Sequence, residues 1–486
     1  MKEAENDSAT AKPSCPNCAR LYGRVAELEA VVPALQALLE KAQKRIRDLE
    51  ERLGQNSRNS HRPSSQDPPQ LPKRPRKEPT GRKPGGQLGH EGKNRDLLPP
   101  EEVNHFVVHT PPVCENCHHD LPAVVPLDLP VLRHQVVDLA EKLYEVTEHR
   151  VYVLTCEDCG HASRGEIPEE VACSSFGPKL TALAAFLTGA CQTSRRQVEE
   201  IVEDVLDIPI ALGTITNMEA EVTQALETPY QEAGEAVREA AAKNLDETSW
   251  KDNNKNVWLW TAATASVAFF VIHANRGIRG LKALVGGILR GVFTSDRWKA
   301  YGIRALHCRQ ICWAHLIRDF QKLIDRGGEA AGIGKRAKEL AGEIFMVWRD
   351  FKAGGIDRAT LRATLAPVRR QLRSLLEKGA STLSTVDEKA ATFCQNLLDL
   401  EPALWAFLRY DGVEPTNNRA ERVLRRGVLW RKRSFGSRSE RGLRFAERIL
   451  TVVQTRRLQQ QRVYPFLVEA VAAHRAGKQA PSLLAA

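Results

Sequence analysis

The sequence predicts a multidomain protein of mixed α+β and α/β type. The chain has 486 residues, of which 42% are hydrophobic, so it is long enough for three or more domains of ~100–200 residues with real cores. An apolar seven-residue repeat fills residues 21–53. In the second half of the chain, β-rich apolar runs alternate with segments of helical periodicity. These three observations indicate a helical N-terminal arm joined to several globular parts that contain both helices and strands.

The charge balance restricts the possible partners. Lys and Arg number 70 against 60 Asp and Glu, which gives a net charge of +10 and a pI near 9.1. A basic excess favours a polyanionic partner, either nucleic acid or a membrane surface. The N-terminus is polar, and no stretch approaches the ~20 apolar residues of a membrane span. We therefore expect a cytoplasmic protein without a membrane partner.

Residues 21–53 carry the pattern of a coiled coil. We label the seven positions of the repeat a to g, with Val25 at position a and Leu28 at the following position d. β-branched residues or Leu then occupy every a position, and mainly Leu occupies the d positions. This distribution favours a parallel two-stranded coil, and hence a dimer. The alternative is one amphipathic helix packed on its own chain. Pro33 lacks an amide donor, so the pattern predicts either a kink there or a new helix that starts at Pro33. The a row is Val25, Val32, Leu39, Ile46 and Leu53, and the d row is Leu21, Leu28, Leu35, Ala42 and Leu49.

Residues 54–100 are rich in Pro, Gly, Asn, Ser and basic side chains, from which no core is expected to form. Two interpretations remain open, a solvated linker and a cationic arm that lies along phosphates. Both can hold together, because such an arm gains its order through counterion release. The residues of this arm that we expect to contact phosphates are Lys73, Arg74, Arg76 and Lys77.

Eleven cysteines in a chain without a secretory signal are not expected to form a disulfide framework, and six of them lie in Cys-x-x-Cys pairs. Cys114 and Cys117 form one pair, and Cys156 and Cys159 form another. Two such pairs predict a tetrahedral zinc site of structural type, against the alternatives of chance pairing or a redox dithiol. The strand-like stretches VLRHQVVDL and HRVYVLTC lie between the pairs, with His118, His119 and His161 as spare ligands. The third pair, Cys15 and Cys18, stays unassigned.

From Gly177 to about Ala225 the periodicity is helical. Apolar residues at helix spacing reach Leu206, the residues Asp207-Ile-Pro-Ile break the pattern, and a second helix starts near Leu212. A helix-turn-helix that reads DNA is one interpretation, and an ordinary helical hairpin of a core is the other.

Three acidic residues stand out in the second half of the chain. The runs VWLWTAA and SVAFFVIH in residues 257–273 predict two adjacent strands. Asp246 precedes them, and Asp296 ends another expected strand that follows a helix at 279–289. The third acid is Glu421, in a helical segment that begins near TNNRAER. Acids at neighbouring strand ends can converge on one cation, and oxygen ligands of this kind suit Mg²⁺ or Mn²⁺.

The segments around these acids resemble those of the insertion-sequence-66 family of transposases. The resemblance rests on DETSW, TSDRWKAYG, CWAHLIRDF and TNNRAERVLRRGVLWRKRSFGS, and it extends over almost the whole chain through QNSRNSHRPSSQD, RKPGGQLGHEG and SFGPKLTALAAFLTGACQTSRRQ. It implies that Asp246, Asp296 and Glu421 are the family's DDE acids and that the core is ribonuclease-H-like. The residues implied beside the acids are His315, from a Cys-x-x-His signature, Asn418 and Arg422. Glu247 remains a rival of Asp246.

The sequence departs from the family's pattern at two places. Thr416 stands where the family usually has Asp, and WRKRSFGS replaces a GRKNWLF-like run. All three expected ligands are present, so we expect an active enzyme.

With the resemblance, each part of the chain has an expected role. The parts are an N-terminal coiled coil for dimerisation (1–55), a basic Pro/Gly-rich linker (56–100), a zinc-binding domain (101–172), a helix-turn-helix-like DNA-binding domain (173–238), a first part of the catalytic core (239–315), a helical insertion (316–408), a second part of the core with a basic helix (409–475), and a tail (476–486).

The expected chemistry is two-metal cleavage and joining of DNA. The expected partners are transposon ends, target DNA, at least a second copy of the chain and accessory proteins of the element, at a nucleoid-associated location. From Arg419 to Arg448 eleven Lys or Arg stand against three acids, so this face should meet phosphates. The residues expected there are Arg419, Arg425, Arg426, Arg431, Lys432 and Arg433. A DNA-binding regulator without catalysis and a ribonuclease-H-fold nuclease are the alternatives.

Overall fold

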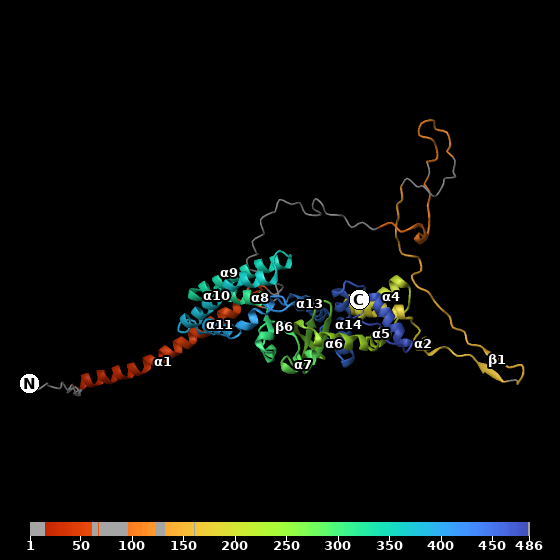
Figure 1. Cartoon of the computed structure of the whole chain (residues 1–486). Coiled ribbons are helices and arrows are strands. Elements are labelled where there is room, and N and C mark those ends of the chain that lie inside the picture. Colours follow the sequence, from red (N-terminus) through yellow and green to blue (C-terminus); the bar gives the residue numbers. More distant parts are fainter. Residues whose placement is uncertain are drawn as a thin grey trace, which may run out of the picture. The chain divides into compact units, whose positions relative to one another are not determined.

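The computed structural model describes residues 15–60, 67, 96–109, 111–121, 132–159 and 161–484 (Figure 1). The chain divides into two compact units. Unit 1 comprises Met1–Gln70, Ile167–Glu199 and Ile210–Ala486, and unit 2 comprises Leu71–Glu166 and Glu200–Pro209. The basic residues Lys73, Arg74, Arg76 and Lys77 lie outside the described residues.

A five-stranded mixed sheet forms the centre of unit 1. Its strands are β3 (Ala242–Asp252), β4 (Lys255–Ala263), β5 (Ala268–His273), β6 (Val292–Ser295) and β7 (Arg309–Ile311), in the order β5-β4-β3-β6-β7. The first three strands are antiparallel neighbours, whereas β6 runs parallel to β3 and β7 parallel to β6. The two adjacent strands predicted in residues 257–273 are therefore confirmed. Asn253 and Asn254 have positive φ in the two-residue turn between β3 and β4, a conformation that Asn tolerates well.

Helices cover both faces of this sheet. On one face, α13 (Asn418–Ser434) and α14 (Glu440–Leu458) pack on apolar side chains of β3, β4 and β5. Gly427 permits close approach there, because a Cβ at this position would lie 2.4 Å from a methyl carbon of Leu259. On the other face, α7 (Ile278–Val285) packs on β4 and β5. This helix was expected at 279–289, but it ends at Val285, before Gly286 with its positive φ.

Four helices lie in sequence between β7 and the α13 segment and form a hydrophobic core of their own. They are α8 (Trp313–Arg326), α9 (Gly328–Lys352), α10 (Arg358–Thr382) and α11 (Glu388–Asp399), and the short α12 (Glu401–Leu404) follows. The apolar face of α10 is buried at Leu361, Leu365, Val368 and Leu372 and partly buried at Leu375.

The helical periodicity predicted from Gly177 is confirmed. The elements are α3 (Pro178–Ala185), a π-helical turn (Phe186–Ala190), α4 (Arg195–Leu206), α5 (Leu212–Ala225) and α6 (Glu227–Glu239). Helix α5 buries one face against α3, α14 and α15 (Val463–Arg475). The break between α4 and α5 lies where the sequence placed it, and DNA reading by this pair stays a prediction.

Helix α1 (Pro16–Leu53) is the N-terminal arm. It is continuous through Pro33, so the interpretation in which a new helix starts there is wrong: the turns on both sides continue the helix across the lost hydrogen bond. The apolar heptad side chains are exposed, Leu35 by 58% and Leu39 by 59%. In this structure of one chain, the seam is therefore not covered by the chain's own described residues.

The segment after α1 corrects a second expectation. Residues 54–60 were expected to lack a core, yet Asn59 and Ser60 are buried. The side-chain amide of Asn59 donates to Asp325 on α8 at 2.7 Å, and Arg326 forms an ion pair with Glu51 at 2.8 Å. Polar side chains thus attach the end of the arm to α8 by hydrogen bonds, which composition does not reveal.

Within Leu71–Glu166, the regular structure among the described residues is the 3₁₀ turn Pro100–Glu102 and a hairpin of β1 (Val153–Thr155) and β2 (Ala162–Arg164), and the other segment of unit 2 contains the end of α4. The stretch VLRHQVVDL was expected to be strand-like, but residues 132–139 form no strand. Val136 is 80% exposed, and a strand needs a pairing partner to be stable. In unit 1, the short α2 (Glu169–Ala172) precedes α3. Within the described part of the chain, no helix is long and apolar enough to cross a membrane.

Candidate metal and catalytic site

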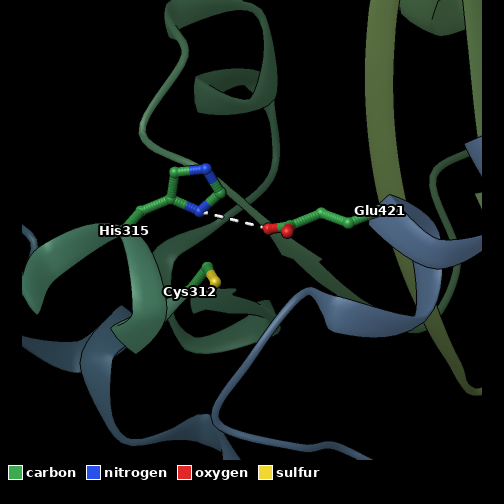
Figure 2. Close-up of side chains that lie close together, drawn as sticks. All are labelled: Cys312, His315 and Glu421. Atoms are coloured by element: carbon green, nitrogen blue, oxygen red, sulfur yellow. Dashed lines mark ion pairs between the residues drawn. The ribbon is translucent and has the colours of Figure 1, made fainter. Parts of the chain in front are cut away.

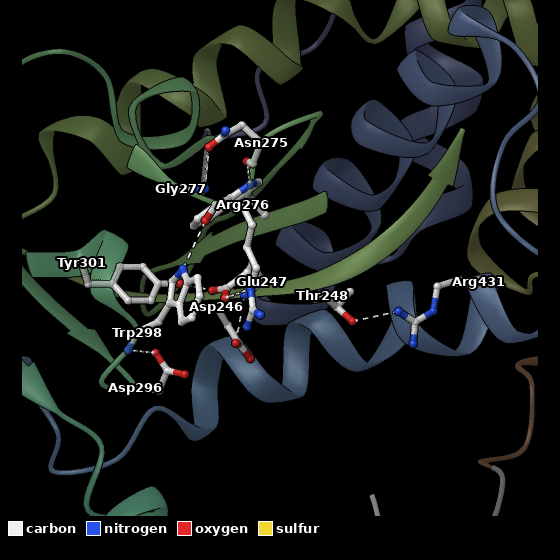
Figure 3. Close-up of polar contacts among 11 residues, drawn as sticks. Asp246, Glu247, Thr248, Asn275, Arg276, Gly277, Asp296, Trp298, Tyr301 and Arg431 are labelled. Atoms are coloured by element: carbon white, nitrogen blue, oxygen red, sulfur yellow. Dashed lines mark hydrogen bonds and ion pairs between the residues drawn. The ribbon is translucent and has the colours of Figure 1, made fainter. Parts of the chain in front are cut away.

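Two of the three expected acids lie on neighbouring parallel strands. Asp246 lies within β3 and not at a strand end as predicted, whereas Asp296 follows β6 directly, as predicted. Asn244 on β3 pairs with Thr294 on β6, and each acid is two residues further along its own strand. Because neighbouring strands lie ~4.8 Å apart, this shared register places Asp246 and Asp296 side by side on the two strands (Figure 3).

The third acid comes from the first turn of α13, which follows the four-helix segment. Glu421 lies near His315, with 3.6 Å between its Oε1 and the Nδ1 of the imidazole (Figure 2). His315 lies in the first turn of α8, just after β7. The start of α8 and the start of α13 therefore face each other, and together they place the Cys-x-x-His segment beside Glu421.

The acids influence each other electrostatically. Burial raises the pKa of Asp246 well above its ordinary value, and the negative charges of Glu247, Asp296 and Glu421 raise it further. Burial also raises the pKa of Glu421; the positive charge of Arg318 opposes that shift and Asp296 adds to it. Several carboxylates that share one site in this way are suited to a divalent cation, whose charge offsets their repulsion.

Glu247 is the rival of Asp246, and it has partners of its own. Its carboxylate forms an ion pair with Arg276 at 3.1 Å and accepts a hydrogen bond from the hydroxyl of Tyr301. The Arg276 guanidinium in turn lies over the rings of Trp258 and Trp298, at 4.6 and 4.2 Å from their centroids. Figure 3 shows Arg276 beside Glu247 and Trp298. Glu247 is thus engaged by protein groups, and its carboxylate is only 3% exposed.

Backbone amides orient the other two aspartates. The amide of Trp298 donates to Asp296 Oδ1 at 2.8 Å, and the amide of Glu247 donates to Asp246 Oδ1 at 2.9 Å. Each of these hydrogen bonds engages one carboxylate oxygen. The second oxygen of each aspartate forms no hydrogen bond to the described residues, as ligation of a cation would require.

Asn417 is a site residue that the sequence analysis missed. This buried side chain donates to the backbone carbonyl of Leu245 at 2.7 Å and accepts from the side-chain amide of Asn244 at 3.2 Å. Its own backbone amide donates to the Cys312 thiol at 3.1 Å. It therefore joins β3 next to Asp246, the start of α8, and the N-terminus of α13. The resemblance pointed instead to its neighbour Asn418, which is exposed. The one sequence signal for Asn417 is its place beside Asn418 at the start of a helix.

Among the described residues, Cys312, His315 and Glu421 form a cluster that could hold a metal ion. Their possible ligand atoms lie within 4.8 Å of one another. Burial raises the pKa of the Cys312 thiol to about 11. A protonated thiol that already accepts a hydrogen bond is a poor metal ligand. Cys312 therefore suits the packing between α8 and α13 better than metal binding, and His315 and Glu421 remain the residues of this group that could hold a metal ion.

The basic residues of α13 divide into two groups. The exposed ones are Arg422, Arg425, Arg426, Lys432 and Arg433. Arg431 and Arg419 are instead half-buried. Arg431 donates to the backbone and hydroxyl of Ser249 and to Thr248, which ties α13 to β3 (Figure 3), and Arg419 contacts Glu414 at 3.4 Å. The exposed group offers the charges that phosphates could reach.

The Cys pairs of unit 2 form two equivalent turns. The Cys114 amide donates to the His119 carbonyl at 2.8 Å, and the Cys156 amide donates to the His161 carbonyl at 2.9 Å. The described residues do not gather three or more of the four thiols around one point. The turns have the local form of metal-binding knuckles, but the tetrahedral site itself stays a prediction. Cys15 and Cys18 lie at the start of α1.

An α/β core whose central strands present buried acids defines a protein suited to metal-dependent chemistry on an anionic substrate. The family model described as "Transposase IS66 family" matches residues 174–445, more than half of the chain. The chain belongs to this family, so the protein is a transposase, which implies that it binds and cleaves DNA. A second model, described as a family of unknown function, matches residues 12–96. No curated relative matches the chain.

Proposed function

We propose that Asp246, Asp296 and Glu421 form a DDE triad that binds two Mg²⁺ or Mn²⁺ ions and catalyses DNA cleavage and strand transfer. The observation that carries this proposal is the shared register of the two aspartates, opposite a helix that starts with Glu421. Asp246 is preferred over Glu247 because Arg276 and Tyr301 already engage the carboxylate of Glu247.

The sheet supports a ribonuclease-H-like core. In chain order its strands are arranged 3-2-1-4-5, with the first three antiparallel and the last two parallel, and helices cover both faces. The central strand carries the first acid, and its parallel neighbour carries the second. The four helices between β7 and α13 would then be an insertion between the second and third acids.

Divalent ions in such a site would activate the attacking oxygen and stabilise the departing one during in-line displacement at phosphorus. The protein's own groups fix the geometry. The amides of Glu247 and Trp298 hold one oxygen of each aspartate. Asn417 fixes the start of the Glu421 helix against β3. Water attack would break the bond between phosphorus and the 3′ oxygen, which takes up a proton, and the freed 3′-hydroxyl would then attack target DNA at the same site.

The remaining parts would serve DNA binding and assembly. The exposed basic residues of α13 and the basic segment near Lys73 would neutralise phosphates of the element's ends. The exposed seam of α1 would pair with a second copy. The two Cys pairs would hold one structural zinc. Helices α4 and α5 would act as a helix-turn-helix, and accessory proteins of the element would join the complex on the nucleoid.

The test uses DNA from both flanks of the gene, where inverted repeats should lie. Purified protein should nick this DNA at the repeat and join the freed 3′ end to a second duplex in Mg²⁺, with no product in EDTA. Binding without either step would indicate a regulator. Cutting without joining would indicate a nuclease of the same fold.

A further inference from the structure

Phe435 is a large apolar residue whose side chain is exposed to solvent. It is 80% exposed, and it occupies the left-handed position at the end of α13, with φ of 58°. Helices usually place Gly or Asn at this position, because a side chain with a Cβ is strained there. Here Gly436 follows instead of occupying the position. A bulky residue at positive φ is unusual and points to a function for the side chain.

The turn around Phe435 is fixed to the central sheet. The Ser437 amide donates to the Lys251 carbonyl at 2.9 Å, and the Asn253 amide donates to the Ser437 carbonyl at 2.9 Å. At Gly436 a Cβ would lie 2.4 Å from the same Lys251 carbonyl oxygen, so only glycine fits there. The end of β3 therefore holds the backbone of this turn in place.

The surroundings of Phe435 are strongly basic. Exposed cations precede it at Lys432 and Arg433 and follow it at Arg438 and Arg441. An exposed aromatic ring among cations has the composition of a nucleic-acid contact, in which the charges bind phosphates and the ring stacks on a base. A second protein chain would have to bury these charges, so charge complementarity favours DNA as the occupant.

For DNA that lies along α13, the distance between the acids and Phe435 gives the position on the DNA that the ring would contact. From Glu421 to Phe435, α13 rises about 21 Å at ~1.5 Å per residue. From Asp246 to Lys251, β3 rises about 17 Å at ~3.4 Å per residue. Both paths start at the site and end at the Phe435 turn. At ~3.4 Å per base pair, this span corresponds to about six base pairs of DNA.

We propose that Phe435 is a wedge that inserts between bases of the bound element end, about six base pairs from the cleaved phosphate, while its basic neighbours hold the backbone. This proposal rests on the proposed function, since it takes the DNA that the carboxylates cut as the ligand. It adds an aromatic stacking site to a surface for which only cationic contacts were expected.

The test uses the full chain bound in Ca²⁺ to duplex DNA from the element's end, with the cleaved phosphate first mapped in Mg²⁺. Thymines are placed singly at four to eight base pairs from the cut and treated with permanganate, which oxidises unstacked thymine. Wild type should show enhanced reactivity near six base pairs. Phe435→Ala should lose it and bind about tenfold more weakly, since base stacking on an aromatic ring contributes on this scale. Phe435→Trp should retain both.

Ile288→Ala is the matched control, because Ile288 is 72% exposed on the same unit but lies outside the turn between α13 and α14, and it should behave as wild type. Equal thymine reactivity and affinity in wild type and Phe435→Ala, with normal cutting, would overturn the wedge alone. A loss of self-association in Phe435→Ala at unchanged thymine reactivity would overturn it in favour of a second copy. Failure of the wild type to bind or cut this DNA would overturn the proposed function together with the wedge.

Discussion

The carboxylate region and the cysteine region are expected to bind metal in different ways. Around Asp246 the protein provides the geometry itself, through a buried sheet, amide donors and Asn417. Around Cys156 it provides two local turns, three-residue strands and mostly exposed side chains. From this difference we predict that the proposed carboxylate site is formed before any ion binds, whereas the cysteine region needs the proposed zinc for its tertiary structure.

Removal of zinc should therefore give the largest structural effect. The full chain should carry about one zinc, and Cys156→Ser should release it, because three ligands cannot hold it as four do. Structural zinc contributes on the order of 10 kcal/mol to folding, so amides of residues 101–166 should lose their protection from hydrogen exchange. The β3–β6 amides should keep theirs.

Cys191→Ser, which alters an exposed cysteine outside the pairs, is the control and should keep the metal. A wild-type protein free of zinc, or an unchanged zinc content in Cys156→Ser, would reject the four-cysteine site.

The end of helix α1 contacts α8, but the described residues leave its apolar seam exposed, and the predicted partner of that seam is a second chain. Replacing Leu35 and Leu39 with Glu should convert the dimer to a monomer in sedimentation, because the charges would be buried at the seam. Ala37→Glu on the outer face of the same helix should remain dimeric. A wild-type fragment of residues 1–55 that sediments as a monomer would contradict the coiled coil.

A smaller effect is expected within the preformed site. Asn417→Ala should remove the donor that Asn417 supplies to the Leu245 carbonyl and one of the two acceptors of the Asn244 side-chain amide, which also donates to the Thr416 carbonyl at 3.3 Å, at a cost of about 1–3 kcal/mol in all. Since the start of the Glu421 helix would also loosen, more Mg²⁺ should be needed for half-maximal cleavage. Asn418→Ala, with an exposed side chain, should change neither quantity. Loss of stability with an unchanged Mg²⁺ requirement would show that Asn417 is purely structural.

The parts of the core that could be predicted from the sequence are those marked by a pattern within one short segment. β-rich apolar runs marked β4 and β5, and Asp296 was found because it ends a short apolar strand. Strand β3 was harder to recognise, since AKNLDETSWKD contains few apolar residues, and Asp246 was accordingly placed at a strand end. Its strand character comes from pairing on both sides, which a single segment does not encode.

Long-range contacts account for most of what the sequence did not reveal. Asn417 forms a hydrogen bond with Leu245, 172 residues away in the sequence, and Arg431 forms one with Ser249, 182 residues away. From the sequence, Asn418 was therefore preferred to Asn417 as a site residue, and Arg431 was expected to be an exposed DNA-binding cation. Long-range contacts also explain why the sequence could not decide whether Asp246 or Glu247 is the metal ligand. The partners of Glu247, Arg276 and Tyr301, lie on other segments.

The most direct test of the account compares alanine variants of the three acids in one assay. Labelled element-end DNA is bound in Ca²⁺ and then cut and joined in Mg²⁺. Asp246→Ala, Asp296→Ala and Glu421→Ala should each bind DNA as wild type does, with its steep salt dependence, yet lose both cutting and joining. Glu247→Ala should be milder than Asp246→Ala. Full activity of Glu421→Ala would place the third ligand elsewhere, and full activity of all three variants would contradict the carboxylate triad.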